Sequence, residues 1–156
     1  MTENVPDVLD LLIRNELAIK RLYEAFAALF PERQSFWRRI AGDEARHAHW
    51  LETLQGQPAF RRWFLSGSRL RPQAIEASIG YVGAQTEKAR LGGFTLLEAL
   101  SVSTDLEAAL LEKQFTKMRG SAPPQIRSIL TDLETETGQH QQTLAEALDA
   151  EKRQLR

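Results

Sequence analysis

The stretch FPERQSFWRRIAGDEARHAHWLETL, residues 30–54, decides the fold of this chain. Its apolar residues return every three or four positions, which is the spacing of one face of an α-helix. Glu44 and His47 lie on that same face, between Ile40 and Leu51. A carboxylate is expensive to bury unless it is paired, protonated or bound to a metal. The pattern therefore predicts a helix that carries a charged or metal-binding group into an apolar core.

Three other segments place polar groups in apolar helical stripes. Glu16 lies in a first pattern, and Glu107 lies in a third pattern that runs from Phe94 to about Met118. His140 lies in a last pattern, with Glu136 beside it. The two halves of the chain therefore look like a weak internal repeat. Each half has a helix with one Glu, a turn, and a helix with a His-based pair.

Proline and glycine divide the chain into helices. Gly56 and Pro58 end the second pattern, and we expect residues 59–71 to be irregular. A shorter helix is predicted from Pro72 to about Arg90. The short turns within each half favour antiparallel neighbours, and the halves are joined by a long crossover. We therefore predict an all-α, four-helix bundle of two antiparallel pairs, with an extra short helix in the crossover and a single domain over residues 1–156.

Composition narrows the class of protein. The chain has 156 residues, of which 42% are hydrophobic and 26% charged, as is typical of a globular domain. A net charge of -1 argues against a nucleic-acid binder. The absence of cysteine excludes disulfides, thiolate zinc sites and iron–sulfur clusters. The N-terminal segment is acidic, and no apolar run approaches the roughly 20 residues that span a bilayer. We expect a soluble cytoplasmic protein that binds neither nucleic acid nor membrane.

The polar groups have the chemistry of a metal site. Glu from two helices and Glu-x-x-His from two others is the di-metal arrangement of ferritin-like bundles. Carboxylates offset the charge of two divalent ions, and imidazole suits iron, manganese and zinc. Position 137, where a second Glu-x-x-His needs Glu, is Thr. The predicted metal ligands are Glu16, Glu44, His47, Glu107, Glu136 and His140.

Three states of this site remain open. In the first, Glu136 replaces the missing carboxylate and the site binds two metal ions fully. In the second, the site binds one ion strongly and one ion weakly. In the third, the site is a relic that hydrogen bonds hold together. Each group also has an ordinary structural alternative. Glu16 could pair with Lys20 on the surface, and His140 could be a hydrogen-bonded bundle histidine. The remaining polar neighbours are expected to be surface groups: Asp43, His49 and Glu112.

On these residues the chain resembles the rubrerythrin-like branch of the ferritin-like superfamily. The segment NELAIKRLYEAFA (15–27) resembles the family's first helix, and residues 30–54 resemble its Glu-x-x-His helix. The segment ALSVSTDLEAALLEKQF (99–115) resembles the second Glu helix, with Gln114 where the family has Tyr. The segment LTDLETETGQHQQTL (130–144) matches at the histidine but not at position 137.

This resemblance implies a ferritin-like bundle with a di-iron centre that reduces peroxide or dioxygen, or oxidises ferrous iron. Manganese or zinc could replace the iron. The resemblance places Tyr23 near the site as a hydrogen-bond donor that supports catalysis. Because the chain has no cysteine, it would need an external electron donor.

Two alternatives of another kind stand beside this interpretation. The chain could be a non-enzymatic bundle with a relic or single-metal site that serves a structural or partner-binding role. It could also be a radical-generating or hydroxylating di-iron enzyme, which would need a substrate pocket. Apolar residues in the crossover helix weakly favour a homodimer, unless they pack on the bundle itself. The aromatic residues Phe60, Trp63 and Phe64 are expected to cap the bundle end or to pack in a dimer contact.

Overall fold

The computed structural model describes residues 7–67, 70–109 and 118–155. Within these residues every regular element is helical, and no strand occurs. The prediction of an all-α bundle is therefore confirmed. The 3₁₀ turns are Pro31–Arg33 and Arg119–Ser121. The α-helices are α1 (Val8–Leu29), α2 (Gln34–Gln55), α3 (Pro58–Gly67), α4 (Pro72–Arg90), α5 (Leu96–Ala108) and α7 (Pro124–Gln154).

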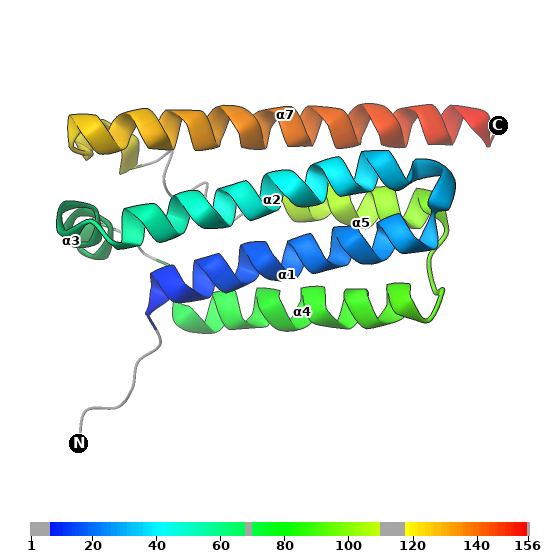
Figure 1. Ribbon diagram of the computed structural model, residues 1–156, viewed down its shortest axis with the longest axis horizontal. Helices are drawn as coiled ribbons and strands as arrows, with labels where there is room; N and C mark the ends of the chain where they lie inside the picture. The colour runs from blue at the N-terminus through cyan, green and yellow to red at the C-terminus, as the bar shows by residue number, and fades with distance from the viewer. Residues whose placement is uncertain (1–6, 68–69, 110–117, 156) are drawn as a thin grey trace, which may run out of the picture.

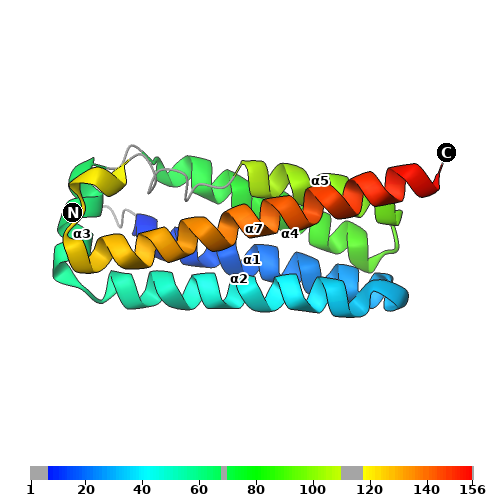
Figure 2. The same cartoon turned by 90° about the horizontal axis from the view of Figure 1, so that it is seen from above.

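The long helices form two antiparallel pairs. Helix α1 packs on α2, and α5 packs on α7. Helix α4 runs alongside α1, outside the four-helix core, and carries the chain back along the bundle before α5 (Figures 1 and 2). Gly92, in the turn after α4, has a φ of 75°, a left-handed conformation that favours glycine. No helix among the described residues is both long and apolar enough to cross a bilayer.

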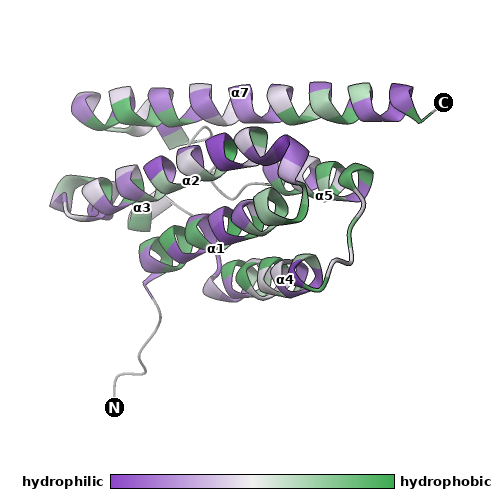
Figure 3. Ribbon diagram, turned by 45° about the vertical axis from the view of Figure 1, so that its right-hand side comes forward, coloured by the Kyte–Doolittle hydropathy of each residue, from purple (hydrophilic) through white to green (hydrophobic). Residues whose placement is uncertain are grey.

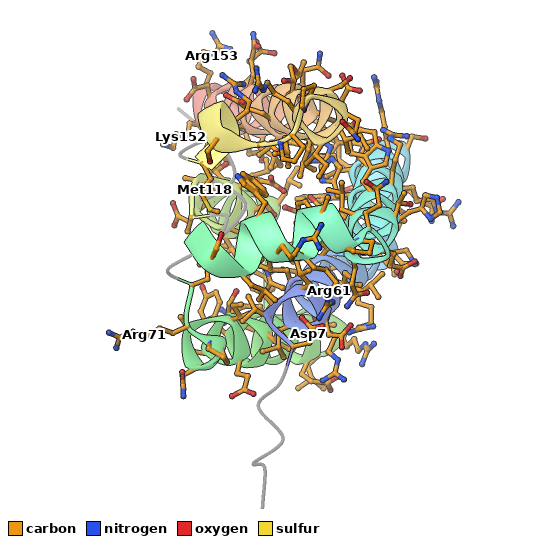
Figure 4. The ribbon with its side chains drawn as sticks, turned by 90° about the vertical axis from the view of Figure 1, so that its left-hand side faces the viewer. Asp7, Arg61, Arg71, Met118, Lys152 and Arg153 are labelled. Atoms are coloured by element: carbon orange, nitrogen blue, oxygen red, sulfur yellow. The ribbon has the colours of Figure 1, made fainter. Side chains whose placement is uncertain are left out.

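The segment after α2 was expected to be irregular, and this expectation is wrong. Residues 58–67 form α3, which lies across one end of the bundle (Figure 4). Pro58 suits the first turn of a helix because that turn needs no backbone donor. Phe60 and Phe64, four residues apart on one face, are fully buried against the bundle end. The aromatic residues therefore cap the bundle, as one of the two sequence interpretations predicted.

A hydrogen-bonded corner ties α3 to the start of α1. Asp7 accepts the backbone N–H of Leu9 at 2.9 Å and so caps α1. Its second oxygen accepts a hydrogen bond from Arg61 of α3, also at 2.9 Å (Figure 4). One carboxylate thus fixes the N-terminus of α1 and the position of the capping helix.

Two apolar layers fill the bundle, one toward each end. The layer near α3 includes Leu12, Leu51 and Phe64. The layer near the α1–α2 turn includes Phe26 and Trp37, whose ring centroids are 4.8 Å apart. Figure 3 shows that hydrophobic and hydrophilic residues alternate around the helices. On α1, α2 and α7 the buried residues Glu16, Glu44, His47 and His140 lie between residues of the two layers, so the bundle contains a polar level at mid-height.

The apolar residues of α4 mostly serve the bundle itself. Ile75 and Val82 are fully buried, and Ile79 packs between the two apolar layers. Tyr81 is 51% exposed. The stripe that weakly favoured a homodimer is therefore largely covered by α1 and its neighbours.

The capping role of α3 predicts a large stability difference between two adjacent positions. Phe64→Ala should lower the free energy of unfolding by about 3–5 kcal/mol, because it leaves a cavity at the bundle end. Leu65→Ala, at a side chain that is 55% exposed, should change it by less than about 0.5 kcal/mol. Urea denaturation of the two variants measures both values. Equal losses would contradict the packing of α3 described here.

Candidate metal centre

Five ionisable side chains meet at the polar level of the bundle. Glu16, Glu44 and Glu107 are fully buried, and His47 and His140 are 1% and 4% exposed. They come from α1, α2, α5 and α7, so every long helix contributes at least one. Each lies three or four residues from apolar residues of the same helix, so its side chain shares their face and points toward the bundle axis. The structure thus brings together five of the six predicted ligands.

Glu44 stands between the two imidazoles. Its Oε2 lies 3.6 Å from Nδ1 of His47, and its Oε1 lies 3.3 Å from Nδ1 of His140. The two rings are 5.2 Å apart between centroids. The two oxygens of this carboxylate therefore point to two different histidines. In each histidine the nitrogen that faces Glu44 is Nδ1.

Glu16 and Glu107 flank this central group on opposite sides. Glu16 Oε2 lies 3.9 Å from Nδ1 of His47, and Glu107 Oε1 lies 3.8 Å from Nδ1 of His140. The level thus divides into two halves that share Glu44. One half contains Glu16 and His47, and the other contains Glu107 and His140.

Most of these atoms have no hydrogen-bond partner in the protein. Both oxygens of Glu16 and of Glu44, Oε2 of Glu107 and Nδ1 of His140 are buried without one. Buried carboxylates without partners are strongly unfavourable. Oxygen and imidazole nitrogen atoms that converge at 3.3–3.9 Å are donors that a transition-metal ion accepts. Glu44, His47 and His140 have donor atoms within 4.8 Å of one another. These residues therefore fit a metal ion.

The outer nitrogens of both histidines face carboxylates from the opposite helix. Nε2 of His140 on α7 lies 2.7 Å from Oδ2 of Asp43 on α2. Nε2 of His47 on α2 lies 3.4 Å from Oε1 of Glu136 on α7. A carboxylate in this position favours a proton on Nε2, so that Nδ1 faces inward with its lone pair free to bind a metal.

Arg46 closes this outer layer. Its guanidinium hydrogen-bonds to both Asp43 and Glu136, while the side chain stays 49% exposed. Asp43, Glu136 and His140 also lie close enough together to hold a cation. Arg46 already supplies a positive charge there, whereas among the described residues only histidines, and no lysine or arginine, lie within ion-pair distance of Glu16 and Glu44. The inner level is therefore the better metal site.

Two polar neighbours differ from expectation. Asp43 was expected on the surface, but it contacts the ring of His140, because the carboxylate that precedes Glu44 points across to α7. Glu136, the sixth predicted ligand, lies against the outer nitrogen of His47 rather than among the inner atoms. His49 is exposed, as expected. Glu112 and Gln114 fall outside the described residues.

Tyr23 links the site to the neighbouring apolar layer. Its hydroxyl donates a hydrogen bond to Oε1 of Glu107 at 2.8 Å, and its ring is fully buried near Trp37. Gln141 donates to the backbone carbonyl of Glu107 at 2.8 Å. Glu107 is thus held from α1 and from α7, with Oε2 left over for a further partner.

Burial and mutual charge separate the pKa values of these groups. Burial and the neighbouring charge of Glu44 raise the pKa of Glu107 to about 8. Burial would also raise the pKa of Glu44, but the two imidazoles outweigh it and lower that pKa to about 2. Burial lowers the pKa of His140, yet Glu107, Glu44 and Asp43 together raise it to about 11. Burial also raises the pKa of Tyr23 well above its usual range, so it remains a donor.

Comparison with protein-family models, curated proteins and solved structures finds no match to this chain. Arguments about its function therefore rest on the site itself.

The raised pKa values predict that the metal-free protein becomes less stable as pH rises. Folded Glu107 keeps its proton up to about pH 8, whereas the unfolded chain loses it near 4.5. Folded His140 keeps its proton up to about pH 11, against 6.5 when unfolded. Because the folded state binds more protons, the free energy of unfolding should fall between pH 5 and 9. Urea denaturation at several pH values measures this fall.

Two comparisons sharpen this test. Glu107→Gln should remove the part of the decline that lies between pH 4.5 and 8. Below pH 4.5 the lowered pKa of Glu44 acts in the opposite sense, and its contribution is lost as pH falls toward 2. A flat profile from pH 5 to 9 would contradict these charge states.

The outer carboxylates predict an effect on metal affinity without direct ligation. Asp43→Asn and Glu136→Gln should each weaken binding of Zn²⁺ by about 10–100-fold, because each loosens the orientation of one histidine. His49→Gln, at an exposed position on α2, should leave the affinity unchanged. Competition titration against a chromogenic chelator measures the affinities. A loss of all binding in Glu136→Gln would instead indicate that Glu136 is itself a ligand.

Proposed function

We propose that this chain is a rubrerythrin-like metal protein of ferritin-like architecture, with a carboxylate-rich centre suited to two ions. The proposal rests on one observation above all. Glu44, fully buried, turns one unpaired oxygen toward His47 and the other toward His140. A carboxylate that faces two imidazoles in this way could help to hold one ion beside each histidine.

The two positions are unequal in this proposal. Glu16, Glu44 and His47 supply one of them, and Glu107, Glu44 and His140 supply the other. Thr137 adds no carboxylate, and Glu136 is engaged with His47 and Arg46. Of the three states left open by the sequence, this geometry favours a strong ion beside a weaker one.

Iron is the metal that we propose, with manganese or zinc as substitutes in vitro. The donors are carboxylate oxygens and imidazole nitrogens without thiolate, a set that all three metals accept. Bound iron supplies one-electron chemistry toward small oxidants such as peroxide or dioxygen, or is itself oxidised from the ferrous state.

The side chains around the metal positions have distinct roles in this reaction class. Tyr23 orients Glu107 through its 2.8 Å hydrogen bond and keeps its own proton. Asp43 holds the outer nitrogen of His140 at 2.7 Å, and Glu136 faces the outer nitrogen of His47 at 3.4 Å, while both Nδ1 atoms face the centre. The apolar layers pack on either side of the polar level. With no cysteine in the chain, electrons would have to come from a separate donor protein or small reductant.

The competing interpretation is a scaffold with a relic site. Relic sites are expected to replace buried charges with apolar or mutually hydrogen-bonded groups, because unpaired carboxylates are destabilising. Here three glutamates are buried, and five of their six oxygens have no hydrogen-bond partner. These unpaired oxygens support a working metal site over a relic.

Metal loading tests the proposal. Protein stripped of metal should bind Fe²⁺ under anaerobic conditions, and the thermal midpoint should rise because binding favours the folded state. Glu44→Gln keeps the side-chain volume but removes the bridging charge, and it should weaken binding more than about 100-fold. Glu52→Gln, an exposed position on the same helix, is the matched control. Oxidation of the loaded protein by peroxide should then give ferric absorbance in the near ultraviolet.

The outcome separates the two interpretations. A folded wild-type protein that binds no iron, manganese or zinc supports the scaffold. Binding that survives unchanged in Glu44→Gln would mean that the ion lies elsewhere. Metal binding without any response to peroxide or dioxygen would leave a metal-binding bundle without the proposed redox activity.

A further inference from the structure

The outer nitrogens of the two histidines belong to a second group of cation-binding side chains. This outer layer comprises Asp43, Arg46, Glu136 and the Nε2 atoms of His47 and His140. Donor atoms of Asp43, Glu136 and His140 lie within 4.8 Å of one another. Two carboxylates and an imidazole are a donor set that divalent transition-metal ions accept. Here the guanidinium of Arg46 supplies the positive charge, because it hydrogen-bonds to both carboxylates.

An unpartnered nitrogen points into the outer layer. Nε2 of His47 is buried without a hydrogen-bond partner, and His47 as a whole is only 1% exposed. This nitrogen faces Oε1 of Glu136 at 3.4 Å, and that oxygen already accepts a hydrogen bond from Nε of Arg46 at 3.1 Å. A buried polar atom without a partner is unfavourable. A cation bound by Glu136 would give Nε2 of His47 a partner.

Arg46 is held in the outer layer by contacts that solvent weakens. Its side chain is 49% exposed. Exposed ion pairs contribute little to stability, because water and salt screen them and because ordering a long side chain costs entropy. Arg46 can therefore turn into solvent by rotation of its own side chain. Asp43 and Glu136 would then be left with two carboxylates and no guanidinium between them.

A groove reaches the outer layer from solvent. It has a volume of about 550 Å³, lies between α2 and α7, and is lined by Asp43 and His140 among others. The charged residues of its lining besides these are Glu146 and Arg39, and the rest of the lining is neutral. Two carboxylates against one arginine favour the approach of a cation over that of an anion.

We propose that the outer layer is an entry site for a divalent metal ion, at which Asp43, Glu136 and the histidines receive the ion in place of Arg46. The inner level is the destination of that ion, so this inference rests on the proposed metal centre. Arg46 is the latch of the entry site. Its guanidinium leaves the two carboxylates when an ion arrives, and it pairs with them again once the ion has moved inward.

His140 connects the entry site to the inner level. Its Nε2 lies 2.7 Å from Asp43 in the outer layer, and its Nδ1 lies 3.3 Å from Glu44 at the inner level. A neutral imidazole offers one lone pair, so the ring binds metal through one nitrogen at a time. When the ion passes from Nε2 to Nδ1, Nδ1 gives up its proton and Nε2 takes up a proton beside Asp43. The ring stays neutral, and Asp43 then orients it toward the centre.

Titration with Co²⁺ alone tests whether the outer layer binds metal. The Glu44→Gln background weakens the inner level and leaves the outer donors in place. In that background, Arg46→Met should strengthen the binding of one Co²⁺ about 10-fold, because two weak ion pairs no longer compete with the metal. Arg38→Met removes the same charge at an exposed position of α2 outside the groove and should have no effect. Addition of Asp43→Asn should abolish the gain. Isothermal titration and Co²⁺ absorption measure the affinities.

The rate of loading tests whether this site leads to the inner level. With Glu44 intact, Arg46→Met should take up Co²⁺ about 10-fold faster than wild type, because the latch is absent. Asp43→Asn should load more slowly than wild type, and Arg38→Met should load at the wild-type rate. Stopped-flow absorption of Co²⁺ measures these rates. A purely structural role of Arg46 predicts weaker binding in Arg46→Met without faster uptake.

The results that overturn the entry site are distinct from those that overturn the metal centre. Wild-type protein that binds no Co²⁺ rejects the metal centre and the entry role with it. Wild-type binding, with neither affinity nor loading rate changed by Arg46→Met, keeps the metal centre and rejects the entry site. A gain that survives Asp43→Asn also rejects it. Should Arg46→Met be unfolded by circular dichroism, Arg46→Lys decides in the same way, because lysine lacks the planar fork that pairs with both carboxylates.

Discussion

Three glutamates sealed between two apolar layers are the constraint on which this structure depends. The two apolar layers are built from hydrophobic residues alone. The glutamates are destabilising wherever their oxygens lack partners, so the bundle must find positive charge at mid-height. Two sources are within reach: protons, or a metal ion. The geometry of the level, with Glu44 between the two histidines, admits both.

Protons and metal compete for the same atoms. The raised pKa of His140 shows that the carboxylates hold an imidazolium firmly when protons are the only source of charge. Glu107 keeps a proton because burial and the charge of Glu44 raise its pKa. A metal ion that binds His140 through Nδ1 must displace the proton from that nitrogen. In the proposed metal site, the positive charge would therefore come either from protons or from a metal ion.

Much of this level could be predicted from the phase of the apolar stripes. Glu16, Glu44, Glu107 and His140 each occupy a stripe position, and helical geometry then directs them inward regardless of how the helices cross. Asp43 and Glu136 could not be placed in this way. Both lie one residue off the stripe, and their partners belong to the opposite helix, so their contacts depend on how α2 and α7 face each other.

Helix α3 escaped prediction for a related reason. Its flanking glycines and prolines resemble those of a loop, and its single buried face is only two aromatic residues long, Phe60 and Phe64. The end of the bundle supplies the surface that this face needs, which no local pattern reveals. The absence of a carboxylate at position 137 was visible in the sequence. The crosswise contacts of its neighbours show why Glu136 cannot simply take its place.

Arg46 gives the buried centre a connection to bulk solvent. Its side chain is half exposed, yet it forms ion pairs with Asp43 and Glu136, the two carboxylates that face the histidines. Ion pairs at such a surface position weaken as dissolved salt screens them. Ionic strength outside the protein would thereby alter the basicity of histidines that are almost wholly buried, and a single exposed side chain would transmit the change.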